Sequence, residues 1–369
     1  MSKRKHKEKE AKKRDEASKH PAATVAVVAH SGKTFGGGLP ELRRVLAEAG
    51  HDDPLWYEVP KSSKAPRAIH RALKKGADLV FVWGGDGMVQ RCIDALAKSE
   101  AELAIIPAGT ANLLATNLGI PRDIARAVSA GLEGPRRSLD VGIMNKERFA
   151  VMAGTGFDAL IMREAGGAAK RRMGRLAYIG GGIKALQARS VRMKIRIDGK
   201  VWWRGKGSCF LAGNVGTITG GLRVFPEASP EDGMLEVGVV TAKSAWQWLQ
   251  VLSRVVRGKV EGSPLMKTGR GKKITVSLGR KMPYELDGGA RDPVRKLEIR
   301  AVSGGVTVCV PPAAAVTGAT PRRRAAPKPA PTRPPAPARA SSPEAQPPKP
   351  PASPSSGSAA TGAPPPAAH

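Results

Sequence analysis

The sequence predicts an α/β domain, with a parallel sheet covered by helices on both faces, followed by a mostly antiparallel β-sandwich domain. Three observations predict this fold class. Short apolar runs alternate with amphipathic helical segments in the first half of the 369 residues. Strictly alternating runs and hairpin turns take over in the second half. Hydrophobic residues make up 41% of the chain, enough to fill two cores.

The first half has the rhythm of repeated β-α units. Strands are expected at 24–29, 55–59, 78–83 and 103–106. Helices are expected at 41–49, from Pro66 to Leu73, at 88–97 and from Pro121 onward. Leu42, Val45 and Leu46 share one helical face, and Gly50 ends that segment. Strands that alternate with helices in this way form a parallel sheet with its faces covered.

The second half has the pattern of antiparallel strands. Residues 191–197 alternate strictly, and Asp198-Gly199 supplies a tight turn before a partner strand at 201–204. Further strands are expected at 209–214, 235–241, 274–278 and 306–310, with one helix at 244–257. We therefore place an α/β domain at 21–138 and a β-sandwich domain at 139–310, whose last strands are free to return to the first domain.

Both ends of the chain have compositions that cannot bury a core. Residues 1–20 are charged, and residues 311–369 are rich in Pro and Ala, so both are expected to be disordered tails. No secretory signal is expected, and no apolar run approaches the length of a membrane span, so membrane contact should be peripheral and the protein cytoplasmic. The net charge of +30 favours polyanionic partners. Cys92, Cys209 and Cys309 are expected to be reduced core residues.

The sequence Gly84-Gly85-Asp86-Gly87 lies between an apolar strand and a helix. Glycines let the backbone approach a phosphate, and the helix N-terminus offers free N–H groups there. Asp86 could accept a hydroxyl proton or hold Mg²⁺ through water; the alternative is a tight turn with a capping Asp.

A second turn of the same kind follows the next strand, at 107–112. Thr110 can donate to a phosphate oxygen, and Asn112 can do the same or brace the loop, although a helix cap by Thr110 is the simpler reading. Because successive parallel strands end at one edge of the sheet, the two turns together favour a shared phosphate site.

These segments resemble the diacylglycerol kinase catalytic family, which includes bacterial diacylglycerol kinases and sphingosine kinases. The resemblance rests on GGDGMVQRCIDAL, IPAGTANLLATNLGIP, AGTGFDALIM, FPEASPEDGMLEV and YELDGG, and it covers roughly residues 24–310. It implies an ATP-dependent lipid kinase with an active site between a nucleotide-binding α/β domain and a β-sandwich. It also implies ATP and Mg²⁺ as cofactors and diacylglycerol, or a related lipid alcohol, as the acceptor.

The resemblance assigns roles to individual residues. The phosphate-binding set is Ser31, Gly32, Gly84, Gly85, Asp86, Gly87, Met88, Thr110 and Asn112. Asp287 matches the residue that supplies the family's proposed general base. Asp232 falls where bacterial members bind a structural Mg²⁺, with the carbonyls of Ser229 and Met234 as neighbouring ligands; the alternative there is a turn before a strand.

Three positions depart from the family pattern. Met88 replaces the usual Thr, and Gly289 replaces the usual Glu that is often proposed as proton acceptor. The first loop lacks its usual Asn-Pro opening, which Lys33 could offset by pairing with a phosphate. Asp287 or Asp86 must then accept the proton. Glu285 is a reserve candidate because strand alternation would place it on the same face as Asp287.

A basic stretch in the second half is a candidate contact with anionic lipid headgroups. It comprises Lys170, Arg171, Arg172, Arg175, Lys184, Arg189 and Arg192. The alternative is a solvated basic face. Of Trp246 and Trp248 in the predicted helix, one is expected in the core and the other at an interface.

Two other functions stay open on the sequence, and a third is not expected. NAD kinase shares a GGDG turn, although the segment from Pro107 to Pro121 favours the lipid branch. The departures at Met88 and Gly289 are compatible with a catalytically silent relative that binds nucleotide or lipid. Specific nucleic-acid binding is not expected, because no basic motif studded with aromatics is present. The chain is also compatible with a homodimer.

Overall fold

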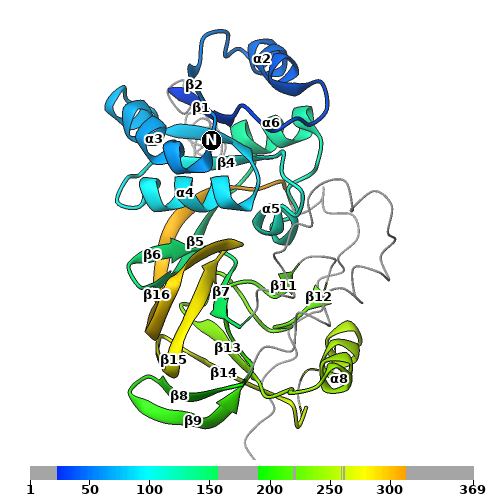
Figure 1. Cartoon of the computed structure of the whole chain (residues 1–369). Coiled ribbons are helices and arrows are strands. Elements are labelled where there is room, and N and C mark those ends of the chain that lie inside the picture. Colours follow the sequence, from blue (N-terminus) through cyan, green and yellow to red (C-terminus); the bar gives the residue numbers. More distant parts are fainter. Residues whose placement is uncertain (1–22, 157–189, 219–221, 259, 261, 313–369) are drawn as a thin grey trace, which may run out of the picture. The chain divides into compact units, whose positions relative to one another are not determined.

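The structure is a computed structural model that describes residues 23–156, 190–218, 222–258, 260 and 262–312 (Figure 1). Its first part contains four parallel strands in the spatial order β2-β1-β3-β4. These strands are β1 (Val25–His30), β2 (Leu55–Val59), β3 (Leu79–Gly84) and β4 (Glu102–Pro107). Every residue of β3 is buried, as expected for a central parallel strand that is covered on both faces.

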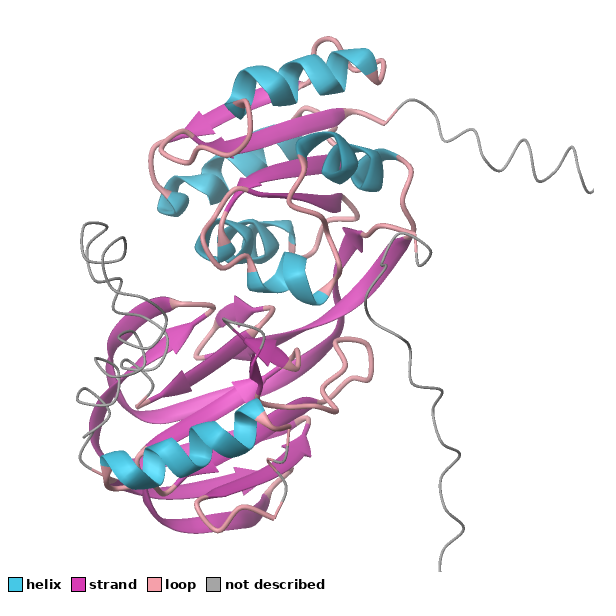
Figure 2. Ribbon diagram, turned by 90° about the vertical axis from the view of Figure 1, so that its right-hand side faces the viewer, coloured by secondary structure: helices cyan, strands magenta, loops and turns pink. Residues whose placement is uncertain are grey.

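Helices cover both faces of these strands, as Figure 2 shows. They are α2 (Gly38–Glu48), the 3₁₀ turn η1 (Ser62–Lys64), α3 (Ala65–Lys74), α4 (Asp86–Leu96), α5 (Leu113–Asn117) and α6 (Ile124–Leu132). Helix α3 contacts α4, and α2 contacts α6. Each buries an apolar stripe against the strands, such as Ala68, Ile69 and Ala72 of α3. The predicted α/β architecture is confirmed.

The second part is mostly antiparallel, which confirms the other half of the predicted fold class. Its strands are β5 (Arg136–Met144), β6 (Glu147–Phe149), β7 (Met152–Thr155), β8 (Val191–Ile197), β9 (Lys200–Gly207), β10 (Cys209–Gly213), β11 (Thr217–Ile218), β12 (Leu222–Arg223), β13 (Leu235–Val240), β14 (Met266–Gly271), β15 (Lys273–Leu286) and β16 (Gly289–Cys309). Among the described residues of this part, helix α8 (Ala245–Val256) interrupts the strands.

Strand β16 joins the two parts into one continuous sheet. It pairs antiparallel with β15 and β5, and its end pairs parallel with β4, where Val308 lies beside Leu103. The sequence pattern predicted only short strands at 274–278 and 306–310. In the structure both belong to much longer strands, because β15 and β16 pair with several neighbours in succession.

Several side-chain expectations can be compared directly with the structure. The three cysteines are buried, as expected for core residues. Trp248 is 3% exposed and Trp246 is 67% exposed, so one tryptophan of α8 is in the core and the other faces solvent. Among the described residues, no helix has the length and apolar content needed to cross a bilayer.

Candidate active site

The glycine-containing loops lie together at one edge of the parallel strands. Strands β1, β3 and β4 run in the same direction, so the loops that follow them meet at their carboxyl ends. A cleft at this edge is where open α/β sheets bind their ligands. The structure therefore brings together the first loop, the loop containing Gly84–Gly87 and the loop containing residues 107–112, as predicted from their spacing.

Two of the glycines are required by close packing: Gly109 because the loops after β3 and β4 touch each other, and Gly84 because the first turn of α4 lies against it. A Cβ atom on Gly109 would lie 2.3 Å from the Cα atom of Gly85 and 2.6 Å from Oδ1 of Asn112. A Cβ atom on Gly84 would lie 2.6 Å from Cβ of Met88. These glycines are thus needed for packing within the protein, whatever ligand the loops bind.

Gly87 is different, because nothing in the protein requires a glycine there. A Cβ atom at this position would meet no heavy atom within 4 Å, and Gly87 is not among the residues with positive φ. Gly87 is exposed and lies in the first turn of α4, whose N-cap residue, Gly85, makes no side-chain capping bond. The backbone N–H of Gly87 is therefore open to an anionic group that approaches more closely than a Cβ atom would allow, whereas the N–H groups of Met88 and Val89 donate to the carbonyl of Gly85.

Asp86 and Asn112 hold the two loops in place. The Oδ1 atom of Asp86 accepts a hydrogen bond from the backbone N–H of Leu113, at the start of α5. Burial raises the pKa of Asp86, against the backbone hydrogen bonds that lower it. Asn112 accepts from the N–H of Gly109 at 2.9 Å and donates to the carbonyls of Pro107 and Gly109. Asn112 therefore braces its loop, the second of the two roles considered for it.

The other residues predicted for the phosphate site differ in whether their polar groups already form hydrogen bonds within the protein. Ser31 donates from Oγ to the carbonyl of Val59 at 3.3 Å. Gly32 is exposed, and its N–H donates to Nδ1 of His30 at 3.1 Å. Thr110 is exposed and has no hydrogen-bond partner within the described part of the chain, so its hydroxyl is available to a ligand. Met88 is 1% exposed, so its side chain is a core residue.

Asp287 occupies the turn between β15 and β16. Asp287 and Gly288 both have positive φ, as a two-residue hairpin turn requires. The Oδ2 atom of Asp287 accepts from the N–H of Ala150 at 2.7 Å, and Oδ1 accepts from Val151 and Met152, both at 2.9 Å. Two lone pairs are used on Oδ1 and one on Oδ2, so Oδ2 retains one lone pair for a proton.

The ionisation of Asp287 is set by opposing effects. Burial raises its pKa to about 7, and the negative charge of Asp86 contributes in the same direction. The three backbone N–H groups favour the ionised form and oppose this rise. A pKa near 7 suits a residue that must accept a proton at neutral pH. The charge effect also indicates that Asp86 and Asp287 are close enough to interact.

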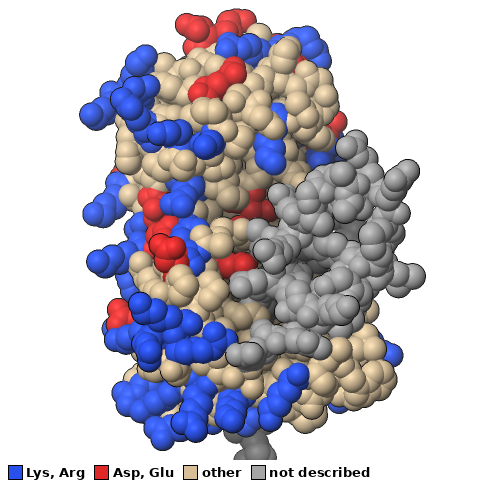
Figure 3. All heavy atoms as spheres, in the orientation of Figure 1, with Lys and Arg blue, Asp and Glu red and all other residues tan. Residues whose placement is uncertain are grey.

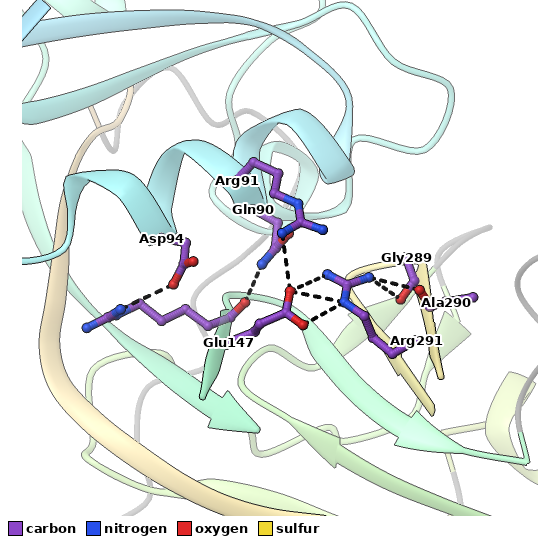
Figure 4. Close-up of polar contacts among 8 residues, drawn as sticks. Gln90, Arg91, Asp94, Glu147, Gly289, Ala290 and Arg291 are labelled. Carbon is purple, nitrogen blue, oxygen red and sulfur yellow. Dashed lines mark hydrogen bonds and ion pairs between the residues drawn. The ribbon is translucent and has the colours of Figure 1, made fainter. Parts of the chain in front are cut away.

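An ion-pair network lies beside this turn (Figure 4). Arg291 binds Glu147 through two nitrogens, with Nε 2.8 Å from Oε1 and Nη2 2.7 Å from Oε2. Arg91 of α4 contacts the same carboxylate at 3.2 Å. Arg148 binds Asp94 of α4 at 3.2 Å. The network therefore ties the helix that begins at Asp86 to strands β6 and β16.

The network also lies against the glycine at position 289. A Cβ atom on Gly289 would lie 2.7 Å from Nη1 of Arg291, so a glutamate there would displace the guanidinium. Hydrogen bonding to Arg291 keeps the pKa of Glu147 below its usual range. Glu285, the reserve candidate, is 8% exposed in strand β15, whereas Asp287 has left the strand for the turn, so simple alternation does not relate the two side chains.

The predicted structural Mg²⁺ site has a different arrangement. Asp232 accepts from Nη2 of Arg270 at 2.6 Å and from the N–H of Met234 at 3.0 Å. The described residues contain no group of three acidic, His or Cys side chains that could hold a metal ion. A divalent cation could bind Asp232 and the carbonyls of Ser229 and Met234 only if the exposed Arg270 side chain moved away from this carboxylate, and the metal site stays a prediction.

Four residues at the site were missed by the sequence reasoning: Glu147, Arg291, Asn214 and Arg122. Asn214 donates to the carbonyls of Asp140 and Ala150, which supports the turn that binds Asp287. Arg122 donates to the carbonyl of Gly109 at 3.4 Å and lies over the ring of Phe35, so it adds positive charge beside Thr110. No local pattern marks these residues, because their partners are distant in the sequence.

The site combines backbone N–H donors at the carboxyl edge of a parallel sheet with a buried carboxylate that an attached β domain supplies. Comparison with known proteins gives one family match for each of these two parts. Residues 23–144 match the family described as diacylglycerol kinase catalytic domain. Residues 151–312 match the family described as YegS C-terminal NAD kinase beta sandwich-like domain.

Similar proteins include bacterial diacylglycerol kinases. A diacylglycerol kinase of Bacillus subtilis (strain 168) is 28% identical over 254 residues, covering 68% of this chain and 83% of that protein. One from Staphylococcus carnosus (strain TM300) is 28% identical over 267 residues, covering 71% and 87%. The crystal structure of a diacylglycerol kinase from Bacillus anthracis str. Sterne matches with a TM-score of 0.65 at 23% identity, covering 80% and 100%. Residues 23–144 thus resemble the diacylglycerol kinase catalytic domain, and the chain is similar to two bacterial diacylglycerol kinases over 68% and 71% of its length.

Proposed function

We propose that this protein is an ATP-dependent lipid kinase, which transfers the γ-phosphoryl group of ATP to the hydroxyl of diacylglycerol or a related lipid alcohol. The observation that carries the proposal is Gly87. This glycine is not explained by packing within the protein, and it opens the N-terminus of α4 beside the unpartnered hydroxyl of Thr110. A phosphate chain that approaches this backbone would account for both features.

In the proposed reaction, the N–H groups at the start of α4 and the Thr110 hydroxyl hold the phosphates of ATP. The lipid hydroxyl oxygen forms a bond to the γ-phosphorus while the bond to the ADP oxygen breaks, and ADP leaves. The hydroxyl proton passes to Oδ2 of Asp287, which has a free lone pair and a pKa of about 7. Arg122 offsets negative charge beside the phosphates. Mg²⁺ that arrives with the nucleotide supplies further charge neutralisation.

Asp86 has a positioning role in this proposal. Its carboxylate is bonded to the N–H of Leu113, so it fixes the distance between the loop after β3 and the loop after β4. Its charge also contributes to the raised pKa of Asp287. Catalysis of phosphoryl transfer depends mainly on such positioning and on charge stabilisation. The absence of a hydroxyl at Met88 and of a carboxylate at Gly289 is therefore compatible with activity.

The test is to incubate the purified chain with Mg²⁺, labelled ATP and a panel of acceptors in detergent micelles. The panel contains diacylglycerol, monoacylglycerol, sphingosine and, as a separate arm, NAD. We expect label in one of the lipids and none in NAD. Label in NAD alone would make the protein an NAD kinase. ATP binding without label in any acceptor would make it a catalytically silent relative.

We further propose that the protein works at the cytoplasmic face of a membrane, where its lipid substrate resides. The proposed contact is peripheral and is made by side chains at the protein surface. Most of the basic stretch considered for this contact, residues 170–189, lies outside the described residues, but Arg192 is described and lies at the start of β8.

A further inference from the structure

The outward face of strands β8 and β9 carries an unusual arrangement of positive charge. Along β8 the residues Val191, Met193 and Ile195 are buried, so Arg192 and Lys194 point to the other face. Figure 3 shows Lys and Arg gathered over this part of the molecule, at the lower left.

The pairing register places like charges directly opposite each other. Arg192 lies across from Lys206, and Lys194 lies across from Arg204. Like charges at directly opposed positions destabilise a sheet. None of the four forms an ion pair with the residues that the structure describes. The fold therefore tolerates a repulsion that an anionic partner would relieve.

These four cations surround a hollow of about 490 Å³. Strand β15 provides its floor, with Ser277 opposite Lys194 and with Gly279 farther along. A Cβ atom on Gly279 would lie 3.2 Å from Cβ of Arg192, so glycine lets this arginine lie close to the floor. Strand β15 pairs with β8, which in turn pairs with β9, so its small residues leave a basin beside the two cationic strands. The aliphatic stems of the cations suit the apolar part of a lipid headgroup, and their charged ends suit its phosphate.

We propose that the basic face, defined by Arg192, Lys194, Arg204 and Lys206, docks on an anionic lipid bilayer and seats a lipid phosphate in its hollow. The choice of a bilayer rests on the proposed lipid kinase function, which requires access to a substrate held in a membrane. Nucleic acid is the alternative polyanion. Its single strands bind through aromatic stacking as well as charge, but Trp202 and Trp203 of β9 are half-buried and pack against the core.

The test is sedimentation of the full chain with phosphatidylcholine vesicles, with and without phosphatidylglycerol. We expect binding only to the anionic vesicles. Each cation near such a surface contributes about 1 kcal/mol, or roughly fivefold, so the double variant Arg204→Gln/Lys206→Gln should bind about 30-fold more weakly. The matched control is Lys74→Gln/Lys75→Gln, which removes the same charge from exposed positions at the end of α3 and should bind as the wild type does.

A second variant tests the hollow itself. Ser277→Leu fills the floor without changing charge, at an exposed position. It should weaken binding to phosphatidylglycerol vesicles while leaving the circular dichroism and the unfolding midpoint unchanged. Unaltered vesicle binding in this variant would overturn the seating of a lipid phosphate in the hollow.

Kinase activity on a short-chain diacylglycerol that dissolves as a monomer separates this inference from the proposed function. The Arg204→Gln/Lys206→Gln variant should retain activity on the soluble lipid and lose it on vesicles. If the wild type phosphorylates no lipid but still requires this face for vesicle binding, the proposed function fails and the docking surface stands. Equal loss of vesicle binding in the two double variants would overturn the docking surface. So would an Arg204→Gln/Lys206→Gln variant that loses binding to DNA but binds vesicles as the wild type does.

Discussion

Replacing Gly87 and Gly109 by alanine, one at a time, should separate ligand binding from folding at the two loops. At Gly87 an added Cβ atom meets no heavy atom within 4 Å. The protein should therefore keep its stability or gain about 0.5 kcal/mol, because alanine is favoured over glycine in a helix. The same methyl group lies where the phosphates would approach the N-terminus of α4. Gly87→Ala should thus weaken ATP binding at least tenfold.

At Gly109 the expectation is reversed. The added Cβ atom would lie 2.3 Å from the Cα atom of Gly85, a backbone atom that cannot rotate away. Overpacking of this kind costs on the order of 2–3 kcal/mol. For a body of this size, that corresponds to a fall of about 3–6 °C in the unfolding midpoint. Gly109→Ala should therefore lower stability and nucleotide affinity together.

Thermal unfolding and isothermal titration with ATP would measure the two effects on the same samples. The reasoning predicts that Gly87→Ala loses affinity without losing stability, and that Gly109→Ala loses both. If Gly87→Ala bound ATP as tightly as the wild type, the first turn of α4 would not be the phosphate site. If Gly109→Ala were fully stable, the close contact between the two loops would be wrong.

Three other changes test the surrounding residues. The rate of phosphoryl transfer should rise with pH through about 7 as Asp287 ionises. Asp86→Asn should move that inflection to lower pH, because the charge of Asp86 raises the pKa of Asp287. A rate that stays constant over about two pH units either side of 7 would show that Asp287 is not the base. Glu147→Gln should lower the free energy of unfolding by about 2 kcal/mol at neutral pH, measured by urea denaturation. The pKa of Glu147 is lowered in the folded state, so the difference in the free energy of unfolding between the two proteins should shrink as pH falls below the usual range of a glutamate and vanish below the lowered pKa. A difference that does not change with pH would contradict the pairing with Arg291. Chelation with EDTA should leave the unfolding midpoint unchanged because Asp232 is already neutralised; a fall that Mg²⁺ restores would show a structural metal.

The sequence was sufficient for the features that depend on local pattern. Apolar runs separated by helical segments predicted β1 to β4 in their parallel arrangement, and the glycines after β3 and β4 predicted where the loops would meet. Asp198-Gly199 correctly marked a hairpin, because its turn chemistry is contained in two residues.

Features that depend on long-range register could not be read in this way. Asp287 binds the N–H of Ala150, which is 137 residues away, and Arg291 binds Glu147, which is 144 residues away. Strand β16 extends beyond its apolar segment because it pairs with β15, β5 and β4 in turn. Arg270 reaches Asp232 only because β14 pairs beside β13. Each of these contacts follows from the assembled sheet and leaves no local signal.

The most direct test of the account is phosphoryl transfer from γ-labelled ATP to diacylglycerol by the wild type and by Asp287→Asn, with ATP affinity measured for both proteins. The account predicts labelled phosphatidic acid with the wild type, and a loss of at least a hundredfold in rate with Asp287→Asn, as expected for removal of a general base, at unchanged ATP affinity. Equal rates in the two proteins would contradict the role of Asp287. No labelled lipid from a wild-type protein that binds ATP would contradict the proposed kinase activity itself.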